Sequence, residues 1–131
     1  MRVMIDSNII ISAVVFRSAK MGEVIERIAD RYELCIATCC TDEVRAVMAE
    51  KFTDSNAGLD EFFEDVPYTL IETPEITGSP LFQIRDSDDY LILHTAVVSQ
   101  VDIFVTGDKD FFDVKIDRPE ILSPMGFLAK Y

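Results

Sequence analysis

Short apolar runs alternate along this chain with longer stretches in which apolar residues return every three or four positions. The short runs have the length of strands, and the longer spacing is that of one face of an amphipathic helix. Residues 20–30 illustrate the second pattern, because Met21, Val24, Ile25 and Ile28 would share one helix face. The pattern predicts strands at Arg2 to Asp6, Glu33 to Ala37, Tyr68 to Glu72, Asp102 to Thr106 and Glu120 to Ser123.

Helical periodicity fills most of the segments between these strands. Strands that alternate with helices form parallel crossovers and carry helices on both faces of the sheet. A chain of 131 residues with 49% hydrophobic content suits one core, so we expect a single α/β domain over residues 1–131, a three-layer α/β/α fold around a mostly parallel sheet of four to five strands. The predicted helices run over about Asn8 to Val15, Lys20 to Asp30, Thr41 to Phe52, Leu59 to Val66 and from a cap at Ser87 or Asp88 to Gln100, with short helical turns at Lys109 to Phe112 and Met125 to Ala129.

Carboxylates stand at the ends of these elements. Asp6 ends the first predicted strand, and Asp108 follows the fourth one just after Thr106. Asp89 lies in the first turn of the helix before the fourth strand, and Glu43 lies on the helix after the second. Ligands of open parallel sheets bind beyond the carboxyl ends of the strands, where these acids would gather and repel one another. Hard cations such as Mg²⁺ or Mn²⁺ would relieve that repulsion, and two such ions about 3.5–4 Å apart can promote phosphodiester hydrolysis.

Each of these acids also has a simpler interpretation. Asp6 and Asp108 stand where helix N-caps belong, and the aspartates of the segment RDSDD place favourable negative charge at a helix N-terminus. Glu43 by itself is typical of a surface residue. The four acids together, each on the element that brings it to one edge, favour a metal site.

The net charge of −12 complicates a role on nucleic acid. A protein this acidic repels a bare polyanion, and two divalent cations would offset only part of the excess. If nucleic acid is the substrate, local cations must hold it. The candidates near the proposed edge in sequence are Arg17, Lys20, Arg85 and Lys109.

The remaining chemistry of the sequence is plain. Cys35, Cys39 and Cys40 lack the spacing of a zinc site, and we interpret them as reduced core residues. His94, the single histidine, stands among apolar residues of a predicted helix and is interpreted as packed rather than as a base. No apolar run approaches the ~20 residues that cross a bilayer, and Asp6 comes too early for a secretory signal. We expect a cytoplasmic protein.

Five segments carry a resemblance to a known family: VMIDSNIIISAVVF, DEVRAVM, RDSDDYLILHTAV, DIFVTGDKDFF and ILSPMGFL. Their order, with VTGDKD after RDSDD, is more specific than any one of them. The set is similar to the PIN-domain family of metal-dependent ribonucleases, and most of all to its small stand-alone members in toxin–antitoxin systems, which are related to VapC-like toxins. The resemblance covers essentially the whole chain and implies the fold expected above.

The resemblance also implies an activity. It predicts a Mg²⁺- or Mn²⁺-dependent endoribonuclease with one or two ions, whose hydrolysis of RNA leaves a 5′-phosphate and a 3′-hydroxyl. It admits an antitoxin protein and a second copy of the chain as partners, and it involves no membrane. The residues implied to bind metal and to carry catalysis are Asp6, Glu43, Asp89 and Asp108.

Supporting positions follow from the same resemblance. Asn8 and Thr106 are expected to orient the carboxylates by hydrogen bonds, and Asp86 is a further supporting residue. The segment ATCCTDE lacks the usual start of this helix, so Asp42 is an alternative to Glu43. The two other aspartates of RDSDD likewise stay alternatives to Asp89.

Two other function classes fit parts of the sequence. A catalytically weak PIN-like protein that binds a basic partner would suit the net charge of −12. A Mg²⁺-binding receiver-type regulator would also gather aspartates at strand ends. The receiver fits less well, because the third strand ends in Glu72 and Thr73 and nothing basic follows the fifth.

Overall fold

The computed structural model describes residues 1–131, and its centre is a parallel sheet. The strands are β1 (Arg2–Ile5), β2 (Glu33–Ala37), β3 (Thr69–Ile71), β4 (Ile103–Val105) and β5 (Glu120–Leu122). They lie in the order β3-β2-β1-β4-β5, and every neighbouring pair is parallel. The chain builds outward from β1 to β3 and then from β4 to β5, so the order reverses between β1 and β4. Receiver domains have the order 2-1-3-4-5, which argues against the receiver alternative.

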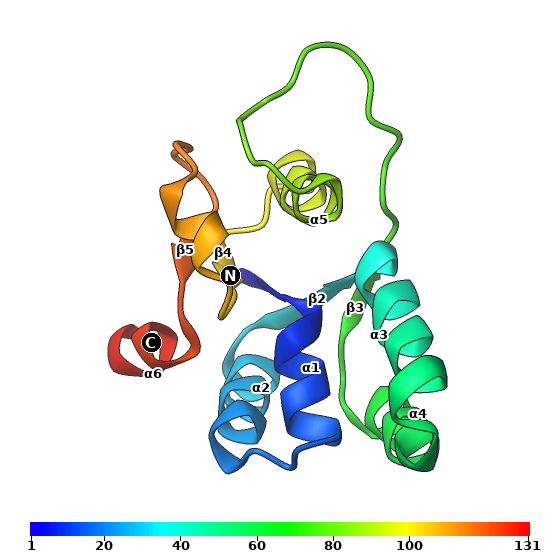
Figure 1. Ribbon diagram of the computed structural model, residues 1–131. Helices are drawn as coiled ribbons and strands as arrows, with labels where there is room; N and C mark the ends of the chain where they lie inside the picture. The colour runs from blue at the N-terminus through cyan, green and yellow to red at the C-terminus, as the bar shows by residue number, and fades with distance from the viewer.

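Helices cover both faces of the sheet. Figure 1 shows α5 on one face and α1 and α2 on the other. This arrangement confirms the predicted three-layer α/β/α fold with a parallel sheet. The helices are α1 (Ser7–Val14), α2 (Ala19–Arg31), α3 (Thr38–Lys51), α4 (Asn56–Asp65), α5 (Ser87–Val98) and α6 (Pro124–Lys130), with the short 3-10 helices η1 (Thr53–Ser55) and η2 (Lys109–Asp113).

The middle of the sheet forms the core. Met4 and Ile5 of β1 and Phe104 and Val105 of β4 have no exposed surface. Strands with helices over both faces bury both sets of alternating side chains, which is why these segments are continuous apolar runs. The edge strand β3, by contrast, exposes Leu70. The carboxyl ends of the two central strands are therefore held by the best-packed part of the molecule.

Helix α3 begins at Thr38, three residues before the predicted start at Thr41. The residue before it, Ala37, has no side chain that could cap the helix, so the local sequence carries no start signal. The cap comes from a distant residue, because the backbone N–H of Cys39 donates to Oγ1 of Thr73 (2.9 Å), just beyond β3. The hydroxyl oxygens of Thr38 and Thr73 also lie 3.0 Å apart. A tertiary contact fixes where this helix starts.

Helix α5 is capped by Asp86, and the predicted caps Ser87 and Asp88 are wrong. The Asp86 carboxylate accepts hydrogen bonds from the backbone N–H groups of Asp88 (2.8 Å) and Asp89 (3.1 Å). The first carboxylate of the segment RDSDD reaches both free N–H groups, whereas the later ones are already part of the helix.

The cysteines and the histidine lie in or near the core. All three cysteines are free; Cys35 and Cys40 are buried and Cys39 is partly buried. His94 is buried on α5, with its ring stacked on that of Tyr90, and its Nδ1 has no hydrogen-bond partner. None of the helices is long and apolar enough to cross a membrane.

Candidate metal centre

The carboxyl ends of β1 and β4 bring two chain-distant polar residues together. These strands pair with Ile5 opposite Val105, and the backbone N–H of Asp6 donates to the carbonyl oxygen of Val105 (3.0 Å). Asp6 and Thr106 therefore leave the sheet side by side, at the point where the strand order reverses. Ligands of open parallel sheets bind at such a point.

Asp6 is buried, with 6% of its surface exposed, and each of its carboxylate oxygens has a donor. Oδ1 accepts a hydrogen bond from the backbone N–H of Ser7 (2.8 Å) at the start of α1. Oδ2 accepts a hydrogen bond from the hydroxyl of Thr106 (2.8 Å). The same hydroxyl oxygen accepts a hydrogen bond from the backbone N–H of Asp108 (3.1 Å). One fully buried hydroxyl thus links the Asp6 carboxylate to the backbone that carries Asp108.

Three carboxylates converge next to this link. One oxygen from each of Asp89, Asp108 and Asp110 lies within 4.8 Å of the others. Asp108 caps η2 by accepting a hydrogen bond from the backbone N–H of Asp110 (2.9 Å), which turns the chain sharply after β4. We call these three residues the carboxylate cluster.

Asp110 of this cluster is a residue that the sequence reasoning missed. The signal was present in the D-K-D spacing after VTG. An aspartate side chain that accepts a hydrogen bond from the backbone N–H two residues later forms a tight turn, which brings the two residues close together.

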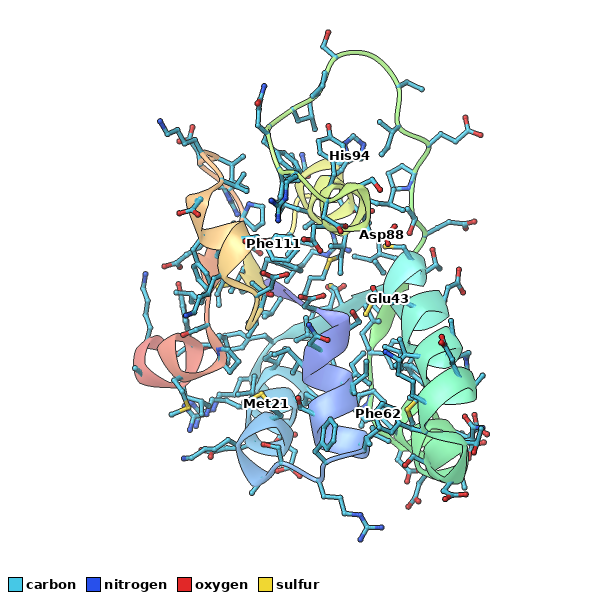
Figure 2. All side chains as sticks on the ribbon, in the orientation of Figure 1. Met21, Glu43, Phe62, Asp88, His94 and Phe111 are labelled. Carbon is cyan, nitrogen blue, oxygen red and sulfur yellow. The ribbon has the colours of Figure 1, made fainter.

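The three aspartates at the start of α5 have different neighbours. A carboxylate oxygen of Asp89 lies near those of Asp108 and Asp110. Asp86 and Asp88 lie within electrostatic reach of Glu43, and Asp86 also lies within reach of Asp89. Figure 2 shows Glu43 on α3 and Asp88 on α5, on neighbouring helices beyond the sheet. Glu43 also lies within reach of Asp6. Neighbouring helix positions face different directions, so Asp42 and Glu43 do not both face the site.

The pKa values of these acids record their crowding. Burial raises the pKa of Asp6, against the lowering effect of hydrogen bonds from Thr106 and Ser7, and the nearby Asp108 raises it further. Burial also raises the pKa of Asp89, to about 6, and the negative charges around it, of which Asp108 contributes most, add to the shift. Partial burial raises the pKa of Glu43 although its side chain still reaches solvent. Asp6, Asp89 and Glu43 therefore each hold a proton more strongly than a free carboxyl group does in water.

No ion pair neutralises these charges. None of the ion pairs of the structure includes Asp6, Glu43, Asp89, Asp108 or Asp110. The donor set consists of carboxylate and hydroxyl oxygens, which suits hard cations such as Mg²⁺ and Mn²⁺. The thiol of Cys40 lies near Asp6, and burial raises the pKa of this thiol well above its usual range. The residues present therefore fit a divalent cation.

Asn8 does not have the expected orienting contacts. Its side chain is exposed on α1, and no hydrogen bond joins it to a carboxylate. The donor from this segment is Ser7, the first residue of α1, because the backbone N–H that faces the Asp6 cap belongs to that residue. Thr106 supplies the other donor.

Two of the four predicted cations lie away from the site. Arg17 follows the far end of α1, whose N-cap is Asp6, so the helix rise alone puts it on the order of 12 Å from the edge. Lys20 lies in the first turn of α2, at that same far end, and pairs with Glu23 (3.5 Å). Arg85 and Lys109 flank the carboxylate cluster, at the start of α5 and in η2, and neither has an ion-pair partner.

Comparison with known proteins identifies the fold family. A family model described as PIN domain matches residues 2–110. The chain belongs to the PIN-domain family. A chain in the crystal structure of VapBC2 from Rickettsia felis bound to a DNA fragment from their promoter is similar, with a TM-score of 0.70 and 18% sequence identity over 93% of this chain and 97% of that one. At this identity the likeness shows a shared fold. No curated protein matches the sequence.

The PIN-domain match includes every acid of the site. Asp6, Glu43, Asp89, Asp108 and Asp110 all fall within residues 2–110, whereas β5 and α6 lie beyond the match. PIN domains are in general metal-dependent nucleases. The acidic edge of this PIN domain has the composition that such a reaction needs.

Proposed function

We propose that this PIN domain is a metal-dependent endoribonuclease that hydrolyses RNA phosphodiester bonds, and that it is the toxin component of a toxin–antitoxin pair. One observation carries the proposal. Carboxylates from distant parts of the chain meet at the switch point of the sheet, and none of them forms an ion pair with a basic residue of the chain. Repulsion of this kind is costly in a folded protein unless a cation is bound there.

The residues of the site have distinct tasks in this proposal. Asp89, Asp108 and Asp6 hold one or two Mg²⁺ or Mn²⁺ ions, and Glu43 and Asp110 complete the acidic edge. When bound, a divalent ion supplies charge neutralisation, an activated water and stabilisation of the leaving oxygen. Thr106 orients Asp6 and the backbone of Asp108, and a positioning bond of this kind is typically worth 10- to 100-fold in metal affinity.

RNA must be held against the charge of the protein. With a net charge of −12, the molecule as a whole repels a polyanion. Arg85 and Lys109 stand beside the carboxylate cluster without ion-pair partners and are the candidates to contact substrate phosphates. Both residues are also within reach of solvent, so a polynucleotide could approach them.

An antitoxin partner rests on a separate line of support. The similar fold is part of a VapBC2 complex, and a chain with 24 acidic and 12 basic residues offers a complementary surface to a basic partner. Such a partner would lie over the acidic edge and exclude RNA. The protein and its substrate would then meet in the cytoplasm only after the partner is removed.

The decisive experiment incubates the purified protein with a pool of single-stranded and structured RNA. Parallel reactions contain Mn²⁺, Mg²⁺ or EDTA, and the ends of the products are read by sequencing and by phosphatase sensitivity. We expect cleavage with Mn²⁺ or Mg²⁺ that leaves 5′-phosphates and 3′-hydroxyls, and no cleavage with EDTA. Equal cleavage in EDTA, or products with 2′,3′-cyclic phosphates, would contradict the proposal.

A further inference from the structure

The connection between β3 and α5 forms an open pocket together with the first turn of α5. Residues 72–86 contain no helix or strand, and they arch over α5 in Figure 1. The arch is fixed to the helix, because the backbone N–H of Leu81 donates to the hydroxyl of Tyr90 (3.0 Å) and the rings of Phe82 and Tyr90 stack with centroids 4.6 Å apart. The pocket beneath has a volume of about 650 Å³, a size typical of small-molecule sites. We call it the loop pocket.

The walls of the loop pocket combine two kinds of surface. Ile76, Phe82 and Tyr90 line it with apolar groups, while Gln83 and Ser87 add an amide and a hydroxyl. A nucleobase needs this mixture, because its faces are flat and apolar and its edge carries hydrogen-bond donors and acceptors. The ring of His94 also stacks on that of Tyr90, with the ring centroids 5.6 Å apart, which helps to fix the orientation of the Tyr90 ring.

The loop pocket adjoins the carboxylate cluster. A second cavity of about 340 Å³ shares Gln83, Ile84 and Arg85 with it, and its other walls are Asp110 and Asp113. Asp110 belongs to the carboxylate cluster. The two cavities and the cluster therefore follow one another along the surface, with a single set of loop residues between them.

Arg85 is the cation at this junction. It lines both cavities and has no ion-pair partner, although Asp110 and Asp113 face the same space. A guanidinium group suits a phosphate that lies between a bound base and the cluster, because its planar fork matches two phosphate oxygens. An apolar protein side chain would have no use for this cation or for the amide of Gln83.

We propose that the loop pocket holds one unpaired nucleobase of a single-stranded RNA, with Arg85 on an adjoining phosphate. That this RNA is a substrate depends on the nuclease function proposed above, whereas the binding of its base in the loop pocket does not. The base in the loop pocket lies next to the bond presented to the carboxylate cluster, so it is the position at which this PIN domain discriminates among sequences. Base-paired RNA is excluded, because a paired base cannot enter the pocket.

Photo-crosslinking tests the location of the base without any need for cleavage. Single-stranded RNA oligonucleotides carry one 4-thiouridine or 6-thioguanosine at successive positions and are irradiated with the protein in Ca²⁺. We expect crosslinked peptides from residues 76–90, identified by mass spectrometry, for one favoured position of the thiobase. Crosslinks that fall only outside residues 76–90 would overturn the proposal. The loop pocket would then be a candidate site for an apolar side chain of a protein partner.

Two variants with matched controls test the energetics by fluorescence anisotropy of the same RNA. Ile76→Glu places a carboxylate in the apolar wall, and Val98→Glu adds the same charge at a similarly exposed position at the end of α5. We expect Ile76→Glu to weaken binding at least fivefold relative to Val98→Glu, since one stacked base contributes about 5- to 150-fold. Equal affinities of the two variants would overturn the proposal.

The second pair isolates the phosphate contact. Arg85→Gln should reduce the slope of log affinity against log salt by about 0.7, the value for one phosphate of a single strand, whereas Arg17→Gln at the far end of α1 should not change it. An unchanged slope for Arg85→Gln would show that Arg85 does not contact an RNA phosphate, contrary to the proposal. Crosslinks within residues 76–90 without any RNA cleavage would refute the proposed nuclease activity and support the base-binding pocket. Cleavage without such crosslinks would support the nuclease activity and refute the base-binding pocket.

Discussion

The two ends of the same sheet treat negative charge in opposite ways. At the amino ends of the strands each acid has a basic partner from the chain itself, and the backbone N–H of Arg2 also donates to Asp102 (2.8 Å). The Thr69 hydrogen bond and Arg2 lower the pKa of Glu33, and the bond from Lys130 lowers that of Glu120. The ion pairs of this end are Arg2 with Glu33, Arg118 with Asp102 and Lys130 with Glu120.

At the carboxyl ends no such partner exists. Asp6, Asp89 and Glu43 all have raised pKa values, since burial and the neighbouring acids both disfavour their charged forms. The acids at the amino end are therefore neutralised by residues of the chain itself, whereas those at the carboxyl end have no ion-pair partner, as the proposed metal site requires. The difference teaches that the number of acids in this chain says little. The acids proposed to hold a metal are instead marked by the absence of an internal counter-charge.

Neutralising one acid at each end should have the most unequal effects. We predict that Asp108→Asn, like Asp6→Asn, lowers the rate of RNA cleavage in Mn²⁺ by more than about 100-fold, because each removes a charge that holds the metal. Asp102→Asn keeps an oxygen that can accept from the backbone of Arg2 and should retain cleavage within a few fold. The rates are measured on a labelled RNA, with circular dichroism to verify folding. Full activity of both Asp108→Asn and Asp6→Asn would show that the two ends of the sheet do not differ in their role in cleavage.

A divalent cation should stabilise the protein through the carboxyl end alone. At a free Mn²⁺ concentration 100 times its dissociation constant, the free energy of unfolding should rise by about 2.7 kcal/mol. Thermal unfolding with Mn²⁺ and with EDTA measures this increment. It should vanish in Asp89→Asn and persist in Asp102→Asn. An increment in wild type that Asp89→Asn retains would place the cation elsewhere.

The hydroxyl that joins the two acidic strand ends can be removed with little change of shape. Thr106→Val should destabilise the protein by about 1–3 kcal/mol, because it leaves a buried oxygen of Asp6 and the backbone N–H of Asp108 without partners. Mn²⁺ affinity, measured by calorimetry, should fall by about 10- to 100-fold. Thr106→Ser keeps the hydroxyl and should restore most of the metal affinity. Unaltered metal affinity of the Thr106→Val variant would show that Thr106 contributes to packing alone and does not orient the metal ligands.

The smallest effect is a dependence of the metal-free protein on pH. Folding raises the pKa of Asp89 from 3.8 to about 6, so the folded state binds more protons than the unfolded one between these values. Stability should therefore decrease as pH rises through about 6, by on the order of 1 kcal/mol, a figure reduced for solvent screening of this partly exposed carboxylate. Urea unfolding in EDTA at pH 4.5 and pH 7 measures it. Asp89→Asn should flatten the profile, and a rise in stability over this range would contradict the assignment.

The parts of the site that sequence could predict are those tied to strand ends. Asp6 and Asp108 directly follow apolar runs, and parallel strands direct their carboxyl ends to one edge, so their meeting follows from the pattern. The turn after β4 was harder to predict from the sequence. Asp110 joins the carboxylate cluster because its backbone N–H donates a hydrogen bond to Asp108, and no periodicity of the sequence indicates this bond. Arg17 and Lys20 lie away from the carboxyl edge of the sheet, because closeness in sequence to Asp6 is lost along the length of α1.

The sequence by itself determined the α/β alternation, the central strands and the positions of the acids on them, because burial on both faces requires continuous apolar runs and each acid interrupts one at its end. Only the tertiary structure decided which residue caps α3 and α5, which hydroxyl orients Asp6 and which acids lack a counter-charge. Those features depend on atoms that lie up to 100 positions apart in the chain, and a hydrogen bond or an ion pair is decided within a few ångströms. Local pattern fixes the elements, whereas distances across them fix the chemistry.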